Sequence, residues 1–263
     1  MHYNWVTAPY TLEIVQRLAA THHVVFGQYF EPVDSGPVAD DLLVVIGPQS
    51  QTVAEIGAAG YQAVFSGQKT YNGVAILSKR PGAEVVKDVP GLVDPQRRVL
   101  AALYGDLRVL NLYIPNGESV ASEKYQYKIG WLDALTTFIA AEIKRFPKLI
   151  VLGDFNIAPD ERDVYDPQIW AGKVLFSAPE REAFQRLLAT GMCDTFRLFD
   201  QEEQQFSWWD YRMNAFRRNM GLRIDHILAS MPLCEICRSC VIDKQPRHNE
   251  RPSDHTPVMA EFN

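Results

Sequence analysis

Short apolar runs, separated by turn residues, recur along the whole chain and predict most of its regular structure. Runs of about four to eight residues that are rich in Val, Ile, Leu and aromatic residues are typical of β-strands. On this pattern, strands are predicted at His23–Gly27, Leu42–Gly47, Gln62–Phe65, Gly73–Ser78, Arg98–Tyr104, Leu107–Tyr113, Leu149–Gly153, Ile224–Ala229 and Pro257–Phe262.

Helical patterns alternate with these runs. The pattern predicts helices at Thr11–Ala20, Ser122–Arg145 and Pro179–Thr190. The middle segment has apolar residues at helical spacing, namely Leu132, Leu135, Phe138 and Ile139.

Two of the predicted strands, Arg98–Tyr104 and Leu107–Tyr113, are separated only by Gly105-Asp106. Such a short polar connection indicates a β-hairpin, so part of the sheet is expected to be antiparallel. A mixture of hairpins and crossovers favours an α/β fold of packed sheets flanked by helices over a purely parallel sheet.

The composition is that of a globular protein with a large core. The chain has 263 residues, of which 47% are apolar, and it contains no internal repeat and no low-complexity stretch. We find no linker and predict one domain over residues 1–263. An apolar run of about 20 residues, as a membrane span needs, is absent, and no secretory leader is visible. We expect a cytoplasmic protein that does not bind membranes.

The net charge of −6 argues against general affinity for nucleic acids, but one segment is locally basic. Residues 208–223, here called the Arg-aromatic segment, read WWDYRMNAFRRNMGLR, so four arginines are set among aromatic residues and one acid. Arginines next to flat aromatic side chains suit phosphate contacts and stacking on bases or sugars. A solvated loop with aromatics packed beneath it is the alternative, and the position between two acid-bearing strands favours a substrate loop.

Acidic and amide residues stand at the ends of three apolar runs. Asp154 and Asn156 follow the run 148–152, Asp225 opens another run, and Asp254-His255 precedes a third. A strand that ends in an acid exposes the charge at the sheet rim, where its burial cost is avoided. Carboxylates, an amide and an Asp-His pair that converge there are suited to metal-assisted phosphodiester hydrolysis.

Six segments together resemble the bacterial exonuclease III family. They read SGQKTYNGVAILSK at 66–79, LNLYIPNGES at 110–119, GDFNIAP at 153–159, FSWWDYR at 206–212, GLRIDHILAS at 221–230 and PSDHTPV at 252–258. The resemblance covers the chain from about residue 53 to its end, in order and spacing. It implies a four-layer sandwich of two mixed β-sheets between helices. It also implies a monomeric enzyme, dependent on Mg²⁺ or Mn²⁺, that cuts double-stranded DNA at abasic sites and removes nucleotides or blocking groups from 3′ ends.

The resemblance also implies roles for individual residues. Asp154 would orient or deprotonate the attacking water, and Asn156 would hold the phosphate or a metal-bound oxygen. Asp254 would bind the metal, because hard divalent cations prefer carboxylate oxygens. His255, oriented by Asp225, would donate to a phosphate oxygen.

Further residues are expected to contact the DNA. Tyr113 would hydrogen-bond the phosphate from a strand end, and Trp208 would lie against the displaced sugar or base. The other expected substrate-binding residues are Arg98, Asn116, Arg212 and Asn219.

The first fifty residues depart from the family pattern, in which a strand ends in Leu-Gln-Glu and the Glu binds the metal. Asn4 matches the Asn of the first turn and is assigned as a metal ligand, together with Asp154, Asn156 and Asp254. At the expected Glu position, the two candidate strands lead instead to Tyr29 and Ser50. Glu31 is the nearest carboxylate and is assigned as a metal ligand, with a solvated loop residue as the alternative.

The four cysteines are not expected to form a disulfide framework. Cys234, Cys237 and Cys240 form a CxxCxxC run, but Cys193 is distant in sequence and no nearby His completes a metal site. Buried thiols on a short helical turn are the favoured interpretation.

Two functional hypotheses follow. The first is an active DNA-repair hydrolase. The second is a non-catalytic nucleic-acid-binding or regulatory protein that lost its metal-binding Glu. The presence of Tyr113, Asp154, Asn156, Asp225, Asp254 and His255 favours the enzyme. A phosphatase or lipid phosphodiesterase is disfavoured by the Arg-aromatic segment.

Overall fold

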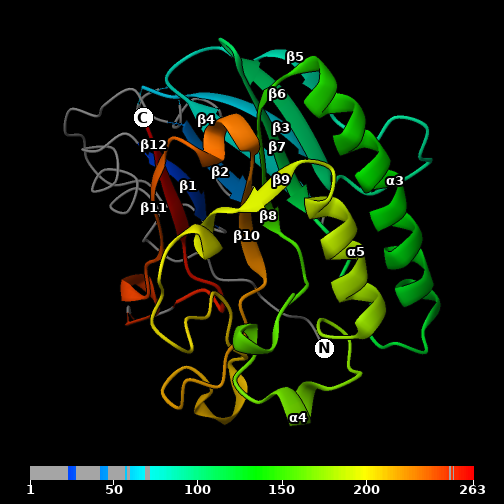
Figure 1. Ribbon diagram of the computed structural model, residues 1–263, viewed down its shortest axis with the longest axis vertical. Helices are drawn as coiled ribbons and strands as arrows, with labels where there is room; N and C mark the ends of the chain where they lie inside the picture. The colour runs from blue at the N-terminus through cyan, green and yellow to red at the C-terminus, as the bar shows by residue number, and fades with distance from the viewer. Residues whose placement is uncertain are drawn as a thin grey trace.

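The computed structural model describes residues 23–27, 42–46, 57, 60–68, 72–248, 250 and 252–263, with two six-stranded sheets as its framework (Figure 1). The first sheet has the strand order β11-β12-β1-β2-β4-β3 and the second has the order β5-β6-β7-β8-β10-β9. The strands of the first sheet are β1 (His23–Gly27), β2 (Leu42–Ile46), β3 (Gln62–Gly67), β4 (Gly73–Ser78), β11 (Cys237–Ile242) and β12 (Val258–Phe262). Those of the second are β5 (Ala83–Val86), β6 (Val99–Tyr104), β7 (Leu107–Tyr113), β8 (Lys148–Asp154), β9 (Met192–Asp194) and β10 (Asp225–Ser230).

Both sheets are mixed. The pairs β1–β2 and β7–β8 are parallel, and the other described pairs are antiparallel. The predicted hairpin is β6–β7, which turns at Gly105 with a φ of 64°. This left-handed conformation suits glycine, which has no Cβ to clash with the backbone.

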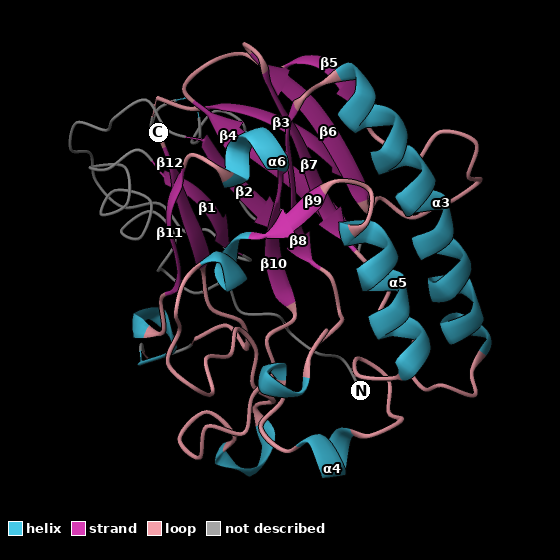
Figure 2. Ribbon diagram, viewed as in Figure 1, coloured by secondary structure: helices cyan, strands magenta, loops and turns pink. Residues whose placement is uncertain are grey.

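Two helices cover the outer face of the second sheet, where they lie side by side (Figure 2). They are α3 (Glu123–Arg145) and α5 (Ala178–Leu188). The start of α3 is stabilised by Ser122, whose hydroxyl accepts a hydrogen bond from the Tyr125 amide. The other helices within the described residues are single turns: α4 (Pro167–Trp170), α6 (Met231–Cys234), and the 3-10 turns η1 (Glu161–Asp163), η2 (Thr195–Leu198), η3 (Arg212–Asn214) and η4 (Gln245–His248).

The central strands have apolar residues on both faces because each face packs against another layer. In β8, Ile150 and Leu152 lie in the core between the sheets, whereas Leu149 and Val151 pack under the helices. Alternate side chains of a strand point to opposite faces, so one continuous apolar run serves both layers. The prediction of a mixed α/β fold of two packed sheets with helices outside is confirmed.

Most predicted elements are found within a residue or two of their predicted bounds. The predicted helix Thr11–Ala20 lies outside the described residues. The strands β5, β9 and β11 were not predicted, because β9 has only three residues and the burial of β5 and β11 does not follow a clear alternation. Within the described part of the chain, every helix is too short or too polar to cross a lipid bilayer.

The prediction for the cysteines is wrong in two respects. Cys193 on β9 and Cys234 on α6 form a disulfide with a Cα–Cα distance of 6.6 Å. Cys237 and Cys240 are free thiols, and they lie on strand β11 and not on a helical turn. Sequence distance misled the prediction, because β9 and α6 are brought together only when both pack beside β10.

Candidate active site

Strand register aligns three of the predicted site residues at one end of the second sheet. Tyr113, the last residue of β7, pairs with Asp154, the last residue of β8. Asp154 in turn pairs with Asp225, the first residue of the antiparallel strand β10. Neighbouring strands are about 5 Å apart, so the three residues form a row across the sheet. The loops that follow β8 and precede β10 gather at this same end, the lower one in Figure 1.

His255 completes the row from the segment before β12. Its Nδ1 lies 2.9 and 3.1 Å from the two carboxylate oxygens of Asp225. Asp225 is fully buried, and the His255 side chain is 9% exposed. One ligand atom from each of Asp154, Asp225 and His255 lies within 4.8 Å of the other two.

Burial and mutual charge shift the pKa values of this group. Burial raises the pKa of Asp154 to about 7; the charge of His255 opposes this shift and that of Asp225 adds to it. Burial alone would lower the pKa of His255, but the charge of Asp225 and its hydrogen bond outweigh burial and raise it to about 9. At neutral pH the imidazole of His255 is therefore a cation, and its Nδ1–H donates to the Asp225 carboxylate.

Asn156 sits on a tight turn directly after β8, with a φ of 50° in the left-handed region. Its side-chain amide donates to the Ile114 carbonyl at 3.0 Å and to Asp154 Oδ2 at 3.1 Å, and its backbone amide donates to Asp154 Oδ1 at 2.9 Å. Its side-chain oxygen accepts from the exposed Asn116 at 3.1 Å. Asn156 therefore fixes the orientation of the Asp154 carboxylate.

Tyr113 is held by Arg98. The guanidinium of Arg98 lies over the Tyr113 ring, 4.7 Å from its centroid, and Nη1 donates to the Tyr113 carbonyl at 3.0 Å. Burial raises the pKa of Tyr113, and the charges of Asp154 and Asp254 add to this effect. The phenol is therefore protonated at neutral pH and available as a hydrogen-bond donor.

Trp208 and Asp254 form the other flank of the site. Trp208 Nε1 donates to Asp254 Oδ2 at 3.0 Å, and an isolated antiparallel bridge pairs Trp208 with His255. The amide of Trp209 donates to the Asp254 carbonyl at 2.9 Å. The start of the Arg-aromatic segment is thus attached directly to the Asp254-His255 pair.

The rest of the Arg-aromatic segment divides into a packed part and an exposed part. Trp209 is fully buried, while Arg217 and Arg218 are exposed. Arg212 is exposed and pairs with Asp210 at 2.6 Å. Asn219 is engaged within the loop, where it accepts from Trp209 Nε1 at 3.3 Å and donates to the Gln204 carbonyl at 3.1 Å.

Arg223, which we had counted with the basic substrate loop, is 1% exposed and bound by carboxylates inside the protein. This correction follows from strand geometry. Arg223 immediately precedes β10, where burial on both faces leaves no exposed position for a charged side chain. The exposed arginines of the segment are Arg212, Arg217 and Arg218.

The sequence interpretation missed a buried lysine that supports the site. Lys128 of α3 is fully buried, and its Nζ donates to the Asn156 carbonyl at 2.6 Å and the Asn116 carbonyl at 3.1 Å. It also forms an ion pair with Glu180 at 2.5 Å. A lysine on the apolar stripe of a helix was the available signal, because a buried charge requires partners.

The donor set on the described residues fits a hard divalent cation. One oxygen each of Asp154 and Asp225 and one ring nitrogen of His255 lie within 4.8 Å of one another, and buried Asp154 has a raised pKa that a nearby cation would lower. Asp254 contributes a carboxylate on the flank of the site, where Trp208 occupies one of its oxygens. Two predicted ligands, Asn4 and Glu31, lie outside the described residues.

The chain is similar to nucleases across most of its length. The profile of the endonuclease/exonuclease/phosphatase family matches residues 11–255. An exodeoxyribonuclease III from Haemophilus influenzae is 38% identical over 216 residues, which cover 77% of this chain and 81% of the relative.

Solved structures agree with this similarity. A 3′ phosphatase, NExo from Neisseria bound to a product DNA hairpin, has a TM-score of 0.86 and 40% identity. The match covers 92% of this chain and all of that one. An AP endonuclease from Archaeoglobus fulgidus has a TM-score of 0.80 and 34% identity, with 86% of this chain and 89% of that chain covered.

Proposed function

The chain belongs to the endonuclease/exonuclease/phosphatase family, and from this premise we propose that it is a hydrolase that cleaves phosphodiester bonds in damaged duplex DNA. We expect its substrates to be abasic sites and 3′ ends, from which it would remove nucleotides or blocking groups, since the similar proteins include an AP endonuclease and a 3′ phosphatase. The observation that carries the proposal is the row of Tyr113, Asp154 and Asp225 with His255 paired to Asp225.

Asp154 is the proposed base. Asn156 holds the Asp154 carboxylate through two hydrogen bonds, so that the carboxylate faces one direction. The raised pKa of Asp154, about 7, makes the carboxylate a suitable acceptor for the proton of an attacking water.

His255 is the proposed donor to the phosphate. Because Asp225 occupies Nδ1 and keeps the ring protonated, the Nε2–H is left to donate to a phosphate oxygen as negative charge builds up on it. Asp225 acts through His255 and is a positioning residue. The Tyr113 hydroxyl would supply a second hydrogen bond to the phosphate.

A divalent cation, Mg²⁺ or Mn²⁺, would be held by Asp154, Asp254 and the Asn156 side-chain oxygen, with Asn4 and Glu31 as further predicted ligands. When bound, such a cation neutralises charge on the phosphate oxygens. Arg98, Asn116, Trp208, Arg212 and Asn219 remain the proposed DNA-contacting residues, with Arg98 acting on the orientation of Tyr113.

No observation on the described residues favours the non-catalytic alternative. The predictions of a cytoplasmic location, a monomeric state and one domain stay predictions.

The test uses two labelled duplexes, one with an internal abasic site and one with a 3′-phosphate, each with Mg²⁺, with Mn²⁺ and with a chelator. We expect metal-dependent cleavage or phosphate release on at least one duplex, and its loss in Asp154→Asn. Asp133→Asn, on the exposed face of α3 and paired with Arg186, is the matched control and should keep full activity. A wild-type protein that binds both duplexes but leaves both intact with either cation would overturn the proposal.

A further inference from the structure

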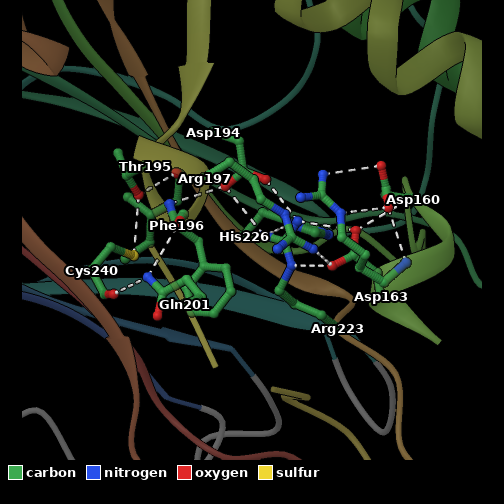
Figure 3. A network of polar contacts seen from close by, with 12 residues as sticks. Asp160, Asp163, Asp194, Thr195, Phe196, Arg197, Gln201, Arg223, His226 and Cys240 are labelled. Atoms are coloured by element: carbon green, nitrogen blue, oxygen red, sulfur yellow. Dashed lines mark hydrogen bonds and ion pairs between the residues drawn. The ribbon is translucent and has the colours of Figure 1, made fainter. Parts of the chain in front are cut away.

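Arg223, two residues before Asp225, is the centre of a buried ionic cluster (Figure 3). The guanidinium contacts Asp163 through Nε at 2.6 Å and Asp194 through Nη2 at 2.7 Å, with a longer contact to each carboxylate. Asp163 is in η1, after β8, and Asp194 is the last residue of β9. Arg223 therefore connects the start of β10 to the segment after β8 and to the end of β9.

His226 is attached to this cluster and lies next to Asp225 in sequence. The Nη1 of Arg223 lies 3.1 Å from His226 Nδ1. A guanidinium nitrogen can only donate, so Nδ1 must be the unprotonated, accepting nitrogen. The hydrogen of the neutral ring is therefore on Nε2, which lies 2.8 Å from the Ile157 carbonyl and donates to it.

Charge and burial agree with this tautomer. Burial and the neighbouring charge of Arg223, acting against the pull of Asp194, together lower the pKa of His226 to about 4. The ring is therefore neutral at pH 7, and the two hydrogen bonds assign which nitrogen carries its proton.

Aromatic packing holds the ring in this orientation. The His226 ring lies edge-on to Phe155, with centroids 5.2 Å apart and planes at 86°. Its centroid is 4.9 Å from that of Phe184 on α5. Because side chains alternate along a strand, His226 points to the helix-covered face, opposite to Asp225. It therefore acts from behind the site and not within it.

The hydrogen bond from His226 to the Ile157 carbonyl matters because Ile157 lies beyond the paired residues of β8 and β10, where no partner strand supplies a donor. The β8–β10 ladder ends at the pair Asp154–Asp225, and the chain then turns away through the left-handed Asn156. Two consecutive carbonyls of that turn are instead held by side chains: Asn156 by Lys128 Nζ and Ile157 by His226 Nε2. These two bonds, together with the bond from the Asn156 side-chain amide to the Ile114 carbonyl, hold the turn that orients the Asp154 carboxylate.

We propose that His226, with its tautomer set by Arg223, is a positioning residue that aligns the Asn156–Ile157 turn, and through it Asp154, for phosphodiester cleavage. The inference rests on the proposed function. It does not require His226 to touch DNA or water, and it predicts a loss in the rate of the chemical step without a loss of substrate binding.

The decisive comparison is His226→Phe against His226→Gln. Phe keeps an aromatic ring between Phe155 and Phe184 but provides neither hydrogen bond. Gln lacks the ring, but its side-chain oxygen can accept from Arg223 and its side-chain nitrogen can donate to the Ile157 carbonyl. We expect kcat of His226→Phe to fall about tenfold to a hundredfold, as a misplaced reacting group does, with KM for duplex DNA within about twofold of wild type. His226→Gln should recover most of kcat.

Wild-type kcat in His226→Phe, an equal loss in the two variants, or a change confined to KM would each overturn the inference. Thermal melting of each variant sets an assay temperature at which both are folded. A wild-type protein without activity in this assay would count against the proposed function instead.

A second measurement needs no variant and no activity. Imidazole ¹⁵N–¹H correlation spectra of the folded wild-type protein at pH 7 should show one histidine as a neutral ring with the proton on Nε2, and that signal should be missing in His226→Gln. A His226 signal with the proton on Nδ1, or on both nitrogens, would refute the assignment.

Discussion

Asp225 holds His255 Nδ1 at 2.9 Å and also pairs in register with Asp154 on the neighbouring strand. One buried carboxylate thus raises the pKa of a cation on one side and of an acid on the other. The two groups proposed to donate and accept protons are therefore shifted by the same residue, and their shifts can be tested together.

The first prediction concerns pH. The active form has Asp154 ionised and His255 protonated, so kcat should fall on the acid side as Asp154 takes up a proton, below a pH of about 7, and on the basic side as His255 loses one, above a pH of about 9. A bound cation favours the ionised form of Asp154, so the acid limb should move to lower pH as the metal concentration rises.

In Asp225→Asn the cause of the raised His255 pKa is removed, so the basic limb should move to lower pH. The measurement is kcat against pH at saturating DNA for both proteins. A basic limb at the same pH in the two would show that Asp225 does not control the protonation of His255.

The second prediction concerns Lys128. In Lys128→Met the Glu180 carboxylate stays buried without its cation, and the free energy of unfolding should fall by about 3–5 kcal/mol. Adding Glu180→Gln removes the uncompensated charge and should restore part of the loss. Denaturant unfolding of the three proteins measures both effects.

Lys124 on the same helix is the matched control. Its ion pair with Glu118 is exposed, so Lys124→Met should change the unfolding free energy by less than about 1 kcal/mol. Equal effects of the two lysine substitutions would contradict the role given to Lys128.

The third prediction concerns the disulfide. Cys193 and Cys234 are 41 residues apart, and opening a loop of this length should lower stability by about 2–4 kcal/mol. Thermal melting with and without dithiothreitol is the measurement. The reductant should lower the Tm of wild type and of Cys237→Ser, whose thiol is free, but should leave Cys193→Ser unchanged. If the reductant has no effect on wild type, the disulfide does not contribute to the stability of the protein.

The fourth prediction separates the exposed arginines from the buried tryptophan of the Arg-aromatic segment. Arg217→Ala with Arg218→Ala should weaken duplex binding and reduce the slope of log K against log salt by about 1–2, with little change in kcat. Arg186→Ala, on α5, is the control and should leave the slope unchanged. Both are read from binding titrations at several salt concentrations.

Trp209→Ala should behave differently, because this side chain is fully buried in a cluster with Phe206 and Ala215. Its expected effect is a loss of about 3–5 kcal/mol in unfolding free energy. A stable Trp209→Ala protein with weakened DNA binding would mean that Trp209 acts as a contact residue.

Local pattern was sufficient for most strands and for the polar residues next to them. The strands with a clear apolar run, such as β8, were predicted, and so was the β6–β7 hairpin, whereas β5, β9 and β11 were not. Asp154 and Asn156 at the end of one apolar run, Asp225 at the start of another and His255 just before a third could be found because polar residues next to a core strand are visible in sequence. Which strands pair, and in which register, is not visible there.

The supporting contacts came only from the tertiary structure. Arg223 meets Asp163 and Asp194 across 60 and 29 residues, and Lys128 meets Glu180 across 52. A charged residue is predicted to be exposed unless its partner is known. No local sequence pattern identifies a partner that is 29 to 60 residues away along the chain. The sequence by itself thus determined the strands and the chemistry at their ends. Sheet register and packing decided which buried charges hold those ends in place, because an ion pair forms only where the fold brings both members out of water together.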